Sequence, residues 1–185
     1  SGVALFGGFV GNESVREARD PAANPTVLSG DLMGDDAPDF VNTVENSYHV
    51  VIATDVDSTG VLDGFIVRAG HADGEGFGPV PASKDQGSGI NVYNAGPVIR
   101  NCIIEDNWSG NHGSLNDHGD TTHIENCTFR HNFSLGFGAG LYIHNHSQTF
   151  VIDCVFEYNI AAGEGGGMYS RSMAGAFIQN CYYRE

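Results

Sequence analysis

The chain has 185 residues, which is enough for one domain with a buried core. Its 23 acidic residues against 8 basic ones give a formal net charge of −15, which argues against nucleic acid and anionic membrane surfaces as partners. With 26 glycines, 41% hydrophobic residues and no apolar run long enough to span a membrane, the chain is predicted to be neither a helical bundle, nor disordered, nor inserted in a membrane.

The first half of the chain, residues 1–88, predicts short strands separated by irregular loops. Two short runs that end at glycines, residues 2–6 and 25–29, are typical of strands. Residues 47–53 and 61–67 look like degenerate copies of a pattern that becomes regular further along the chain.

The second half, residues 89–185, is a repeat that the cysteines mark. Cys102, Cys127, Cys154 and Cys181 stand 25, 27 and 27 residues apart. An aliphatic residue stands three positions before each cysteine, Asn or Asp one position before it, and a large apolar residue two positions after it. Glycine stands 13 or 14 positions upstream and opens a run that alternates with period two, as strands do.

A repeat of this length predicts one coil of a parallel β-helix, because the patterns of leucine-rich and helical repeats are absent. The aliphatic residue and the cysteine have opposite parity, so both face inward only if the chain bends between them. Asn and Asp tolerate the left-handed backbone of such a bend, and stacked Asn side chains can hydrogen-bond from coil to coil. Outside, Glu105, Arg130, Glu157 and Arg184 alternate in charge, which favours one stacking register.

The four cysteines share one column of this arrangement. Disulfides are the alternative in a secreted chain, but the parallel side chains of stacked neighbours fit the S–S dihedral angle poorly. We therefore expect a buried stack of free thiols, and the sequence has no Cys-x-x-Cys spacing that would indicate zinc.

These repeats resemble a known family. The pattern Ile-x-Asn-Cys-x-Phe-x-x-Asn and the run 165–169 are similar to the right-handed parallel β-helix superfamily, the pectate-lyase-like fold, as found in secreted bacterial surface proteins and polymorphic outer-membrane proteins. The resemblance implies an all-β, right-handed solenoid, one domain over residues 1–185, located outside the cell or at its surface. It implies no single function, because this fold hosts lyases, hydrolases, adhesins and fibres.

Both ends of the solenoid are expected to be open. The run that opens such proteins begins here at residue 5, and the last repeat stops at Glu185. Open strand edges favour end-to-end association, so neighbouring subunits or flanking coils of a longer chain are the expected partners.

Residues 108–122 break the repeat, and such breaks are where functional sites tend to lie. Aligned on Gly113, this coil places Ser114 and Asn116 where the others carry apolar residues, unless a loop insertion has shifted the register. The single tryptophan, Trp108, is a candidate platform on which a sugar ring can stack. Asp120 and His146 are further candidates for binding a ligand.

Four polar residues are the candidates for acid–base chemistry or for binding an anionic sugar. They stand at or next to a column four positions past the glycines, expected on the outside of the solenoid, and a solvated polar face is the alternative interpretation. The four candidates are Asp117, His118, His144 and Arg171.

Two acidic clusters suggest Ca²⁺, the only cofactor that the sequence indicates. The first consists of Asp31, Asp35 and Asp36, and the second of Asp55 and Asp57. Carboxylate oxygens suit this ion, but turn chemistry explains the same residues equally well.

The favoured function is a structural or adhesive module outside the cell that associates end to end into a fibre. The alternative is a domain that binds or cleaves polysaccharide, as a lyase or a hydrolase. The scarcity of basic residues argues against a lyase, because a groove for an acidic sugar should be basic. A hydrolase with paired carboxylates stays open, although the spacing identifies no such pair.

Overall fold

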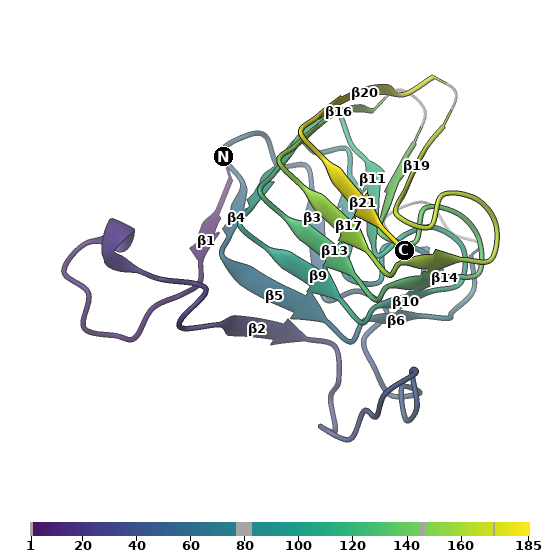
Figure 1. Ribbon diagram of the computed structural model, residues 1–185, viewed down its shortest axis with the longest axis horizontal. Helices are drawn as coiled ribbons and strands as arrows, with labels where there is room; N and C mark the ends of the chain where they lie inside the picture. Colours follow the sequence, from purple (N-terminus) through teal and green to yellow (C-terminus); the bar gives the residue numbers. More distant parts are fainter. Residues whose placement is uncertain (1, 77–82, 145–146, 172) are drawn as a thin grey trace.

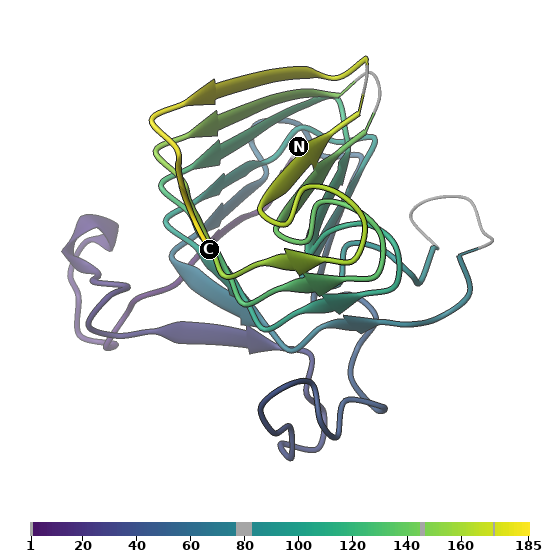
Figure 2. The ribbon, with the colours of Figure 1, turned by 45° about the vertical axis from the view of Figure 1, so that its right-hand side comes forward.

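The computed structural model describes residues 2–76, 83–144, 147–171 and 173–185. These residues form four parallel sheets, which we call A, B, C and D (Figure 1). Each regular turn of the chain adds one strand to each sheet in that order, and Figure 2 shows the turns stacked on one another. The predicted all-β parallel solenoid is therefore confirmed.

The sheets contain the following strands. Sheet A consists of β1 (Ala4–Phe6), β4 (Val61–Asp63), β8 (Val98–Arg100), β12 (Thr121–Glu125), β16 (Gln148–Ile152) and β20 (Gly175–Gln179). Sheet B consists of β2 (Thr26–Ser29), β5 (Phe65–Arg68), β9 (Ile103–Glu105), β13 (Thr128–Arg130), β17 (Val155–Glu157) and β21 (Tyr182–Arg184). Sheet C consists of β6 (His71–Ala72), β10 (Trp108–Ser109), β14 (Phe133–Ser134) and β18 (Ile160–Ala161). Sheet D consists of β3 (Val51–Thr54), β7 (Ile90–Tyr93), β11 (Leu115–His118), β15 (Leu141–Ile143) and β19 (Met168–Ser170).

The corner between sheets A and B is built from left-handed residues, as predicted. The φ angles are 53° at Asn101, 49° at Asn126, 53° at Asp153 and 52° at Asn180. Their side chains also join successive coils, since Nδ2 of Asn126 donates to Oδ1 of Asn101 at 2.8 Å. This bend turns the strand so that the aliphatic residue before it and the cysteine after it both face the core.

The corner that ends sheet B is left-handed as well, and its residues are less suited to that backbone. Ala69, Asp106, His131 and Tyr158 have φ angles of 61°, 51°, 53° and 54°. Left-handed backbone costs an ordinary residue roughly 1–2 kcal/mol. The stacking of the coils on both sides must supply this energy, and it brings these four side chains into one column.

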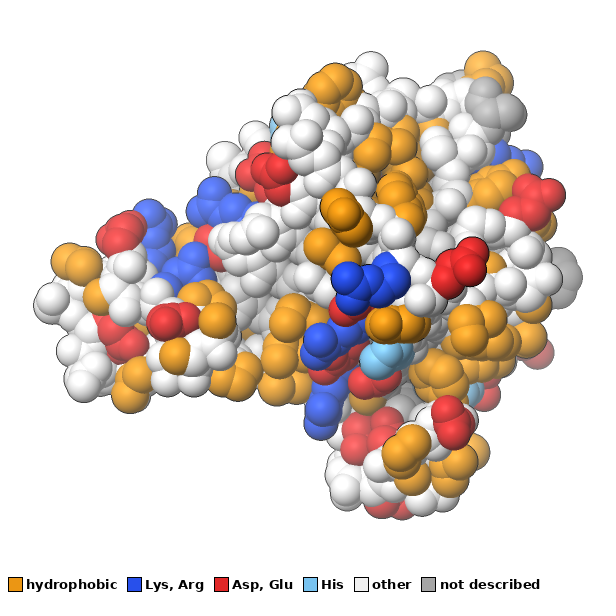
Figure 3. Space-filling view, in the orientation of Figure 1, with side chains coloured by type: hydrophobic (Ala, Val, Ile, Leu, Met, Phe, Trp, Pro, Cys, Tyr) orange, Lys and Arg blue, Asp and Glu red, His pale blue; other side chains and the backbone are white. Residues whose placement is uncertain are grey.

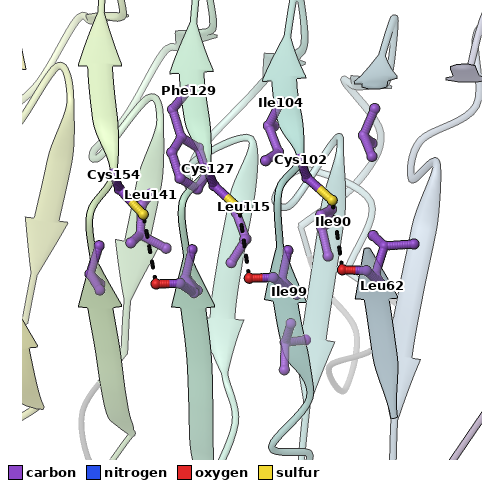
Figure 4. Packing of buried hydrophobic residues seen from close by; sticks show 14 of the residues in the cluster. Leu62, Ile90, Ile99, Cys102, Ile104, Leu115, Cys127, Phe129, Leu141 and Cys154 are labelled. Atoms are coloured by element: carbon purple, nitrogen blue, oxygen red, sulfur yellow. Dashed lines mark hydrogen bonds between the residues drawn. The ribbon is translucent and has the colours of Figure 1, made fainter. Parts of the chain in front are cut away.

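Apolar columns fill the interior of the solenoid. The rings of Phe129 and Phe156, on neighbouring strands of sheet B, stack with centroids 4.8 Å apart. The cysteines are free, and Figure 4 shows Sγ of Cys102 and Cys127 directed at the carbonyl oxygens of Leu62 and Ile99, at 3.7 and 3.6 Å. Burial raises the pKa of the Cys127 thiol, which keeps it protonated and unreactive.

A buried ladder of asparagines connects the coils beside this core. Nδ2 of Asn107 donates to Oδ1 of Asn132 at 3.0 Å, and Nδ2 of Asn132 donates to Oδ1 of Asn159 at 2.9 Å. Each amide also donates to a backbone carbonyl, so these buried polar groups are satisfied. The predicted coil-to-coil hydrogen bonding of asparagines is confirmed here and at the first corner.

The alternating charges on the outside of sheet B also follow the prediction. The strand register aligns Arg68, Glu105, Arg130, Glu157 and Arg184. Nη2 of Arg130 lies 2.6 Å from Oε2 of Glu105, and Nη1 of Arg184 lies 3.8 Å from Oε2 of Glu157.

Residues 1–88 continue the same sheets but leave them in long excursions. The first excursion, between β1 and β2, contains a single 3₁₀ turn, η1 (Arg16–Ala18), and projects to one side (Figure 1). The second, between β2 and β3, hangs below sheet B in Figure 1, and we call its residues 30–46 the acidic loop. In the described part of the chain no helix is both long and apolar enough to cross a membrane.

Candidate functional site

The strand register places three of the four catalytic candidates in one column. Strand β11 ends at His118, which pairs with Tyr93 of β7. Asp117 pairs with Ile143 of β15, and Ile143 pairs with Ser170 of β19. The residues that follow those pairs are therefore neighbours: His118, His144 and Arg171. Backbone hydrogen bonds confirm this register, since the amide of His144 donates to the carbonyl of Asp117 at 3.0 Å.

The prediction that Asp117 points outward is wrong. Leu115 pairs with Ile90 and Asp117 with Val92, so these two residues, and not Ser114 and Asn116, hold the positions of the apolar pair. The alignment on Gly113 was one residue out of register. Because side chains alternate between faces, that single step turns Asp117 into the core and His118 outward.

Asp117 is thus a buried carboxylate within an otherwise apolar column. Its exposed fraction is 0%, and it accepts hydrogen bonds from the hydroxyls of Thr149 and Thr122 at 2.5 and 2.9 Å and from the amide of Gly119 at 3.1 Å. Burial raises its pKa to about 6, although these hydrogen bonds act in the opposite direction. Such a group lacks access to a substrate in this conformation, and its place among the catalytic candidates stays a prediction.

A cluster of aromatic rings covers the outer face of sheet D around His144. The His144 ring centroid lies 5.0 Å from that of His112, 4.5 Å from that of His118 and 4.6 Å from that of Tyr142. Burial lowers the pKa of His144 to about 3, and the neighbouring His and Arg side chains act in the same direction. Burial is also the main cause that lowers the pKa of His112 to about 4. Both imidazoles are therefore neutral near pH 7.

Each of these two imidazoles is tied to an amide. Nε2 of His144 lies 2.9 Å from Oδ1 of Asn116, and Nδ1 of His112 lies 2.6 Å from Oε1 of Gln86. A neutral imidazole that donates to an amide oxygen keeps its second nitrogen as an acceptor, but pKa values of about 3 and 4 make both rings weak bases near pH 7. The arrangement is equally that of a packed polar cluster, so the acid–base role stays a prediction.

Of the predicted ligand-binding residues, Trp108 lies on a different sheet from this cluster. Trp108, in sheet C, stacks against the ring of His71 at 4.5 Å and against that of Phe133 at 6.1 Å, so neighbouring rings cover both of its faces. Asp120 precedes β12 and is exposed. His146 lies outside the described residues. The binding roles of these residues remain predictions.

A cleft opens between the acidic loop and the corner that ends sheet B, and we call it the loop cleft. Its volume is about 730 Å³. Phe40 reaches it from the acidic loop, and Phe133 and Tyr158 reach it from the solenoid. The rings of Phe40 and Phe133 lie 6.2 Å apart, centroid to centroid. The cleft thus has an aromatic surface on both of its sides.

Polar side chains complete the loop cleft. Arg68, Asp106 and His131 line it, and Nδ1 of His131 lies 3.9 Å from Oδ1 of Asp106. Burial, assisted by the negative charge of Glu105, raises the pKa of Asp106 above its usual value. In Figure 3, Lys or Arg, His and Asp or Glu side chains gather on this face just above the protruding loop. Cation, carboxyl and imidazole groups therefore meet beside aromatic rings.

A family model described as a right-handed beta helix region matches residues 42–185. The chain belongs to the right-handed β-helix family. The resemblance inferred from the repeats is thereby confirmed, including the handedness of the coils. Comparison with curated proteins and with solved structures gives no match.

A second hollow of the β-helix, of about 670 Å³, lies under the first excursion and contains three arginines. All three form ion pairs with acidic side chains. Arg19 and Arg100 contact the carboxylate of Asp63 at 2.6 and 2.8 Å, and Arg16 contacts Glu17 at 2.6 Å. Although burial acts to raise it, hydrogen bonds from Asn101 and the two arginines lower the pKa of Asp63. Of the three ion pairs, the one between Arg19 and Asp63 joins the excursion to the β-helix.

The two acidic clusters have different fates in the β-helix. Asp31, Asp35 and Asp36 do lie together, and Glu45 joins them from the other end of the acidic loop. In the second cluster the carboxylates bind neighbouring groups instead: Oδ1 of Asp57 accepts from the amide of Thr59 at 2.9 Å, and Asp55 accepts from Asn94.

The sequence contains one signal for the loop cleft. Asp106, His131 and Tyr158 each stand four positions after a cysteine, so they form a column of their own. Nothing in the sequence placed the acidic loop over that column, because that contact joins segments far apart in the chain.

Proposed function

We propose that this β-helix is an adhesive module that acts outside the cell and binds carbohydrate in the loop cleft. The observation that carries the proposal is the lining of the cleft, which combines the rings of Phe40, Phe133 and Tyr158 with the polar side chains of Arg68 and Asp106. A sugar ring presents C–H groups on its faces and hydroxyls on its rim. An aromatic surface beside a few convergent polar groups is complementary to both.

The charges of the cleft favour a neutral glycan. Asp31, Asp36, Asp39 and Asp106 line it, and the whole chain carries a net charge of −15, so a polyanionic sugar would be repelled. Among the described residues Arg68 makes no ion pair, which leaves its guanidinium free to donate hydrogen bonds to hydroxyls.

Cleavage of the bound glycan is the alternative function, and two carboxyl groups of the same lining favour it. A glycoside hydrolase needs a protonated carboxyl and a second carboxylate on opposite sides of the bond. Asp106, with its raised pKa, suits the first role, and Asp39 on the loop is the residue to examine for the second. Incubation of the protein with a bound glycan, followed by chromatography of the products, separates a lectin-like module from an enzyme.

The test is a glycan microarray followed by calorimetry with the best neutral oligosaccharide. We expect Phe133→Ala and Arg68→Gln each to weaken binding about tenfold or more, since each removes one of the two kinds of contact. Phe150→Ala is the matched control, because Phe150 carries a stacked ring on sheet A, away from the cleft. Absence of glycan binding, or equal affinity in all three variants, would refute the proposal.

End-to-end association into a fibre remains a prediction with one supporting feature. The strands β20 and β21 of the last coil expose large apolar side chains, namely Phe177, Ile178, Tyr182 and Tyr183. Electron microscopy of the purified chain tests it: filaments support association between copies, and discrete particles contradict it.

A further inference from the structure

We propose that the acidic loop holds one Ca²⁺ ion, bound by Asp31, Asp35, Asp36 and Glu45 together with the side-chain oxygen of Asn46. One carboxylate oxygen from each of the four acidic residues lies within 4.8 Å of the others. The sequence indicated the three aspartates, whereas Glu45 and Asn46 join them only through the folding of the loop. This inference does not rest on the proposed carbohydrate binding, although Asp31 and Asp36 also line the loop cleft.

Asn46 is the observation that points to a ligand rather than to a chance cluster. Its exposed fraction is 8%, and its Nδ2 donates to Oδ2 of Asp36 at 2.8 Å and to the carbonyl of Ala69 at 2.9 Å. The carboxamide is therefore held against the cluster from the side of the β-helix. Its oxygen, Oδ1, has no hydrogen-bond partner among the described residues although it is buried.

Two carboxylate oxygens of the cluster are likewise buried without a hydrogen-bond partner among the described residues. Within the described residues, Oδ1 of Asp36 and Oε1 of Glu45 are buried and accept no hydrogen bond. A buried polar atom without a partner destabilises the fold by roughly 1–3 kcal/mol, and more when the group is charged. Two of these oxygens belong to carboxylates of the cluster, and the third belongs to the amide that is hydrogen-bonded to Asp36, so one cation bound here would satisfy them together.

The charges around the cluster lead to the same conclusion. Among the described residues none of the four carboxylates makes an ion pair with Lys, Arg or His. Asp31 accepts from the amides of Gly34 and Asp35 at 2.6 and 3.3 Å, which curls the loop around its carboxylate.

The spacing and the chemistry of the donors favour calcium among the common cations. Bonds from Ca²⁺ to oxygen are roughly 2.3–2.6 Å long, so oxygens on opposite sides of the ion lie about 5 Å apart, as the cluster allows. Mg²⁺ needs a tighter shell of about 2.0–2.1 Å and releases its waters reluctantly. Zn²⁺ prefers nitrogen and sulfur donors, which the cluster lacks.

An ion at this position would tie both ends of the acidic loop to the body of the β-helix. Asp31 lies at the start of the loop and Glu45 near its end, while Asn46 bonds to the corner at Ala69. We therefore expect Ca²⁺ to stabilise the folded chain as well as to bind it, because a ligand that binds only the folded state raises its stability by mass action.

The test is calorimetric titration of the chelator-treated full chain with CaCl₂, compared with MgCl₂, together with thermal unfolding in each salt. We expect one Ca²⁺ per chain, a Kd of about 10⁻⁴ M or tighter, and a Tm that rises with Ca²⁺ and not with Mg²⁺ at equal concentration. Absence of binding, or equal binding of the two ions, would overturn the proposal.

Isosteric variants locate the ion. Asp36→Asn and Glu45→Gln keep the shape of the loop while removing one charge each, and each should weaken Ca²⁺ binding at least tenfold. The double variant Asp55→Asn with Asp57→Asn is the matched control and should bind as the original chain does. Circular dichroism confirms that each variant is folded. If the control loses binding and the cluster variants keep it, the ion lies elsewhere and the inference is wrong.

Discussion

The two halves of this β-helix have different roles: one forms the regular coils, and the other carries the loops that contribute to the candidate sites. From residue 89 onward the coils repeat columns of aliphatic residues, cysteines and asparagines, and Asn107, Asn132 and Asn159 hydrogen-bond from coil to coil. Residues 1–88 add the excursions, and the acidic loop brings an aromatic ring and four carboxylates next to the repetitive half.

This difference shows how a solenoid acquires a site. A column repeated at every coil offers the same side-chain position many times, but one column alone makes a flat surface. The loop cleft exists only where the acidic loop covers the column of Asp106, His131 and Tyr158. A site on such a fold therefore needs two parts: a regular surface from the coils and an irregular excursion that closes over it.

The largest effect should follow from breaking the repetitive half. Phe129→Ala removes a ring that is fully buried and stacked on Phe156, and it should lower the free energy of unfolding by about 3–5 kcal/mol. Phe40→Ala, in the acidic loop, is the matched change and should lower it by about 1 kcal/mol or less. Equal losses in urea denaturation would contradict the division between the two halves.

A smaller effect should come from the one place where the repetitive half breaks its own pattern. The pKa of Asp117 is raised to about 6 in the folded chain from a usual 3.8, so the folded state binds its proton more tightly than the unfolded state does. By linkage, this group should increase the free energy of unfolding by roughly 2–3 kcal/mol as the pH falls from 7 to 4.

Asp117→Asn removes that pH dependence and isolates the contribution of this carboxyl from the rest of the acidic chain. We expect the difference in unfolding free energy between the variant and the original chain to shrink as the pH is lowered, measured by denaturation at pH 4, 5, 6 and 7. A difference that stays constant over this range would show that Asp117 has an ordinary pKa.

The smallest effect should be at the exposed end of the charge ladder of sheet B. Arg184→Gln removes the pair with Glu157, whose side chains are 61% and 20% exposed, and exposed ion pairs of this kind contribute about 1 kcal/mol or less. We expect the loss in stability to diminish at 1 M NaCl, since salt screens the pair. A loss of several kcal/mol, insensitive to salt, would mean that the ladder holds the coils together and does more than set their register.

The columns of the repeat could be predicted from the sequence because each one recurs at fixed spacing. The corner at Asn101 and Asn126, the free cysteines and the charge ladder all followed from a few positions counted from each cysteine. The predicted register was wrong at Gly113, because the alignment of the coils followed this glycine and not the apolar pattern. Leu115 follows Ser114 as Ile90 follows Gly89, so the period-two pattern of the core was the better guide.

The sites were less predictable because they depend on contacts between distant segments. His118, His144 and Arg171 are neighbours because they belong to successive coils, whereas the sequence pattern predicted Asp117 in the place of His118. The approach of Phe40 to Phe133 and of Glu45 to Asp31 could not be predicted, since the excursion that brings them together has no repeat to count against. Sequence periodicity locates the faces of a solenoid, but not the loops that close over them.

The free cysteines provide a way to follow how this molecule unfolds. Each sulfur contacts a backbone carbonyl of the preceding coil, so the native structure needs no oxidant and should form equally well in a reducing cytosol. One thiol reports on each of four consecutive coils, and only Cys181 is partly exposed. The order in which a thiol reagent labels them would show from which end, and in what steps, the coils unfold.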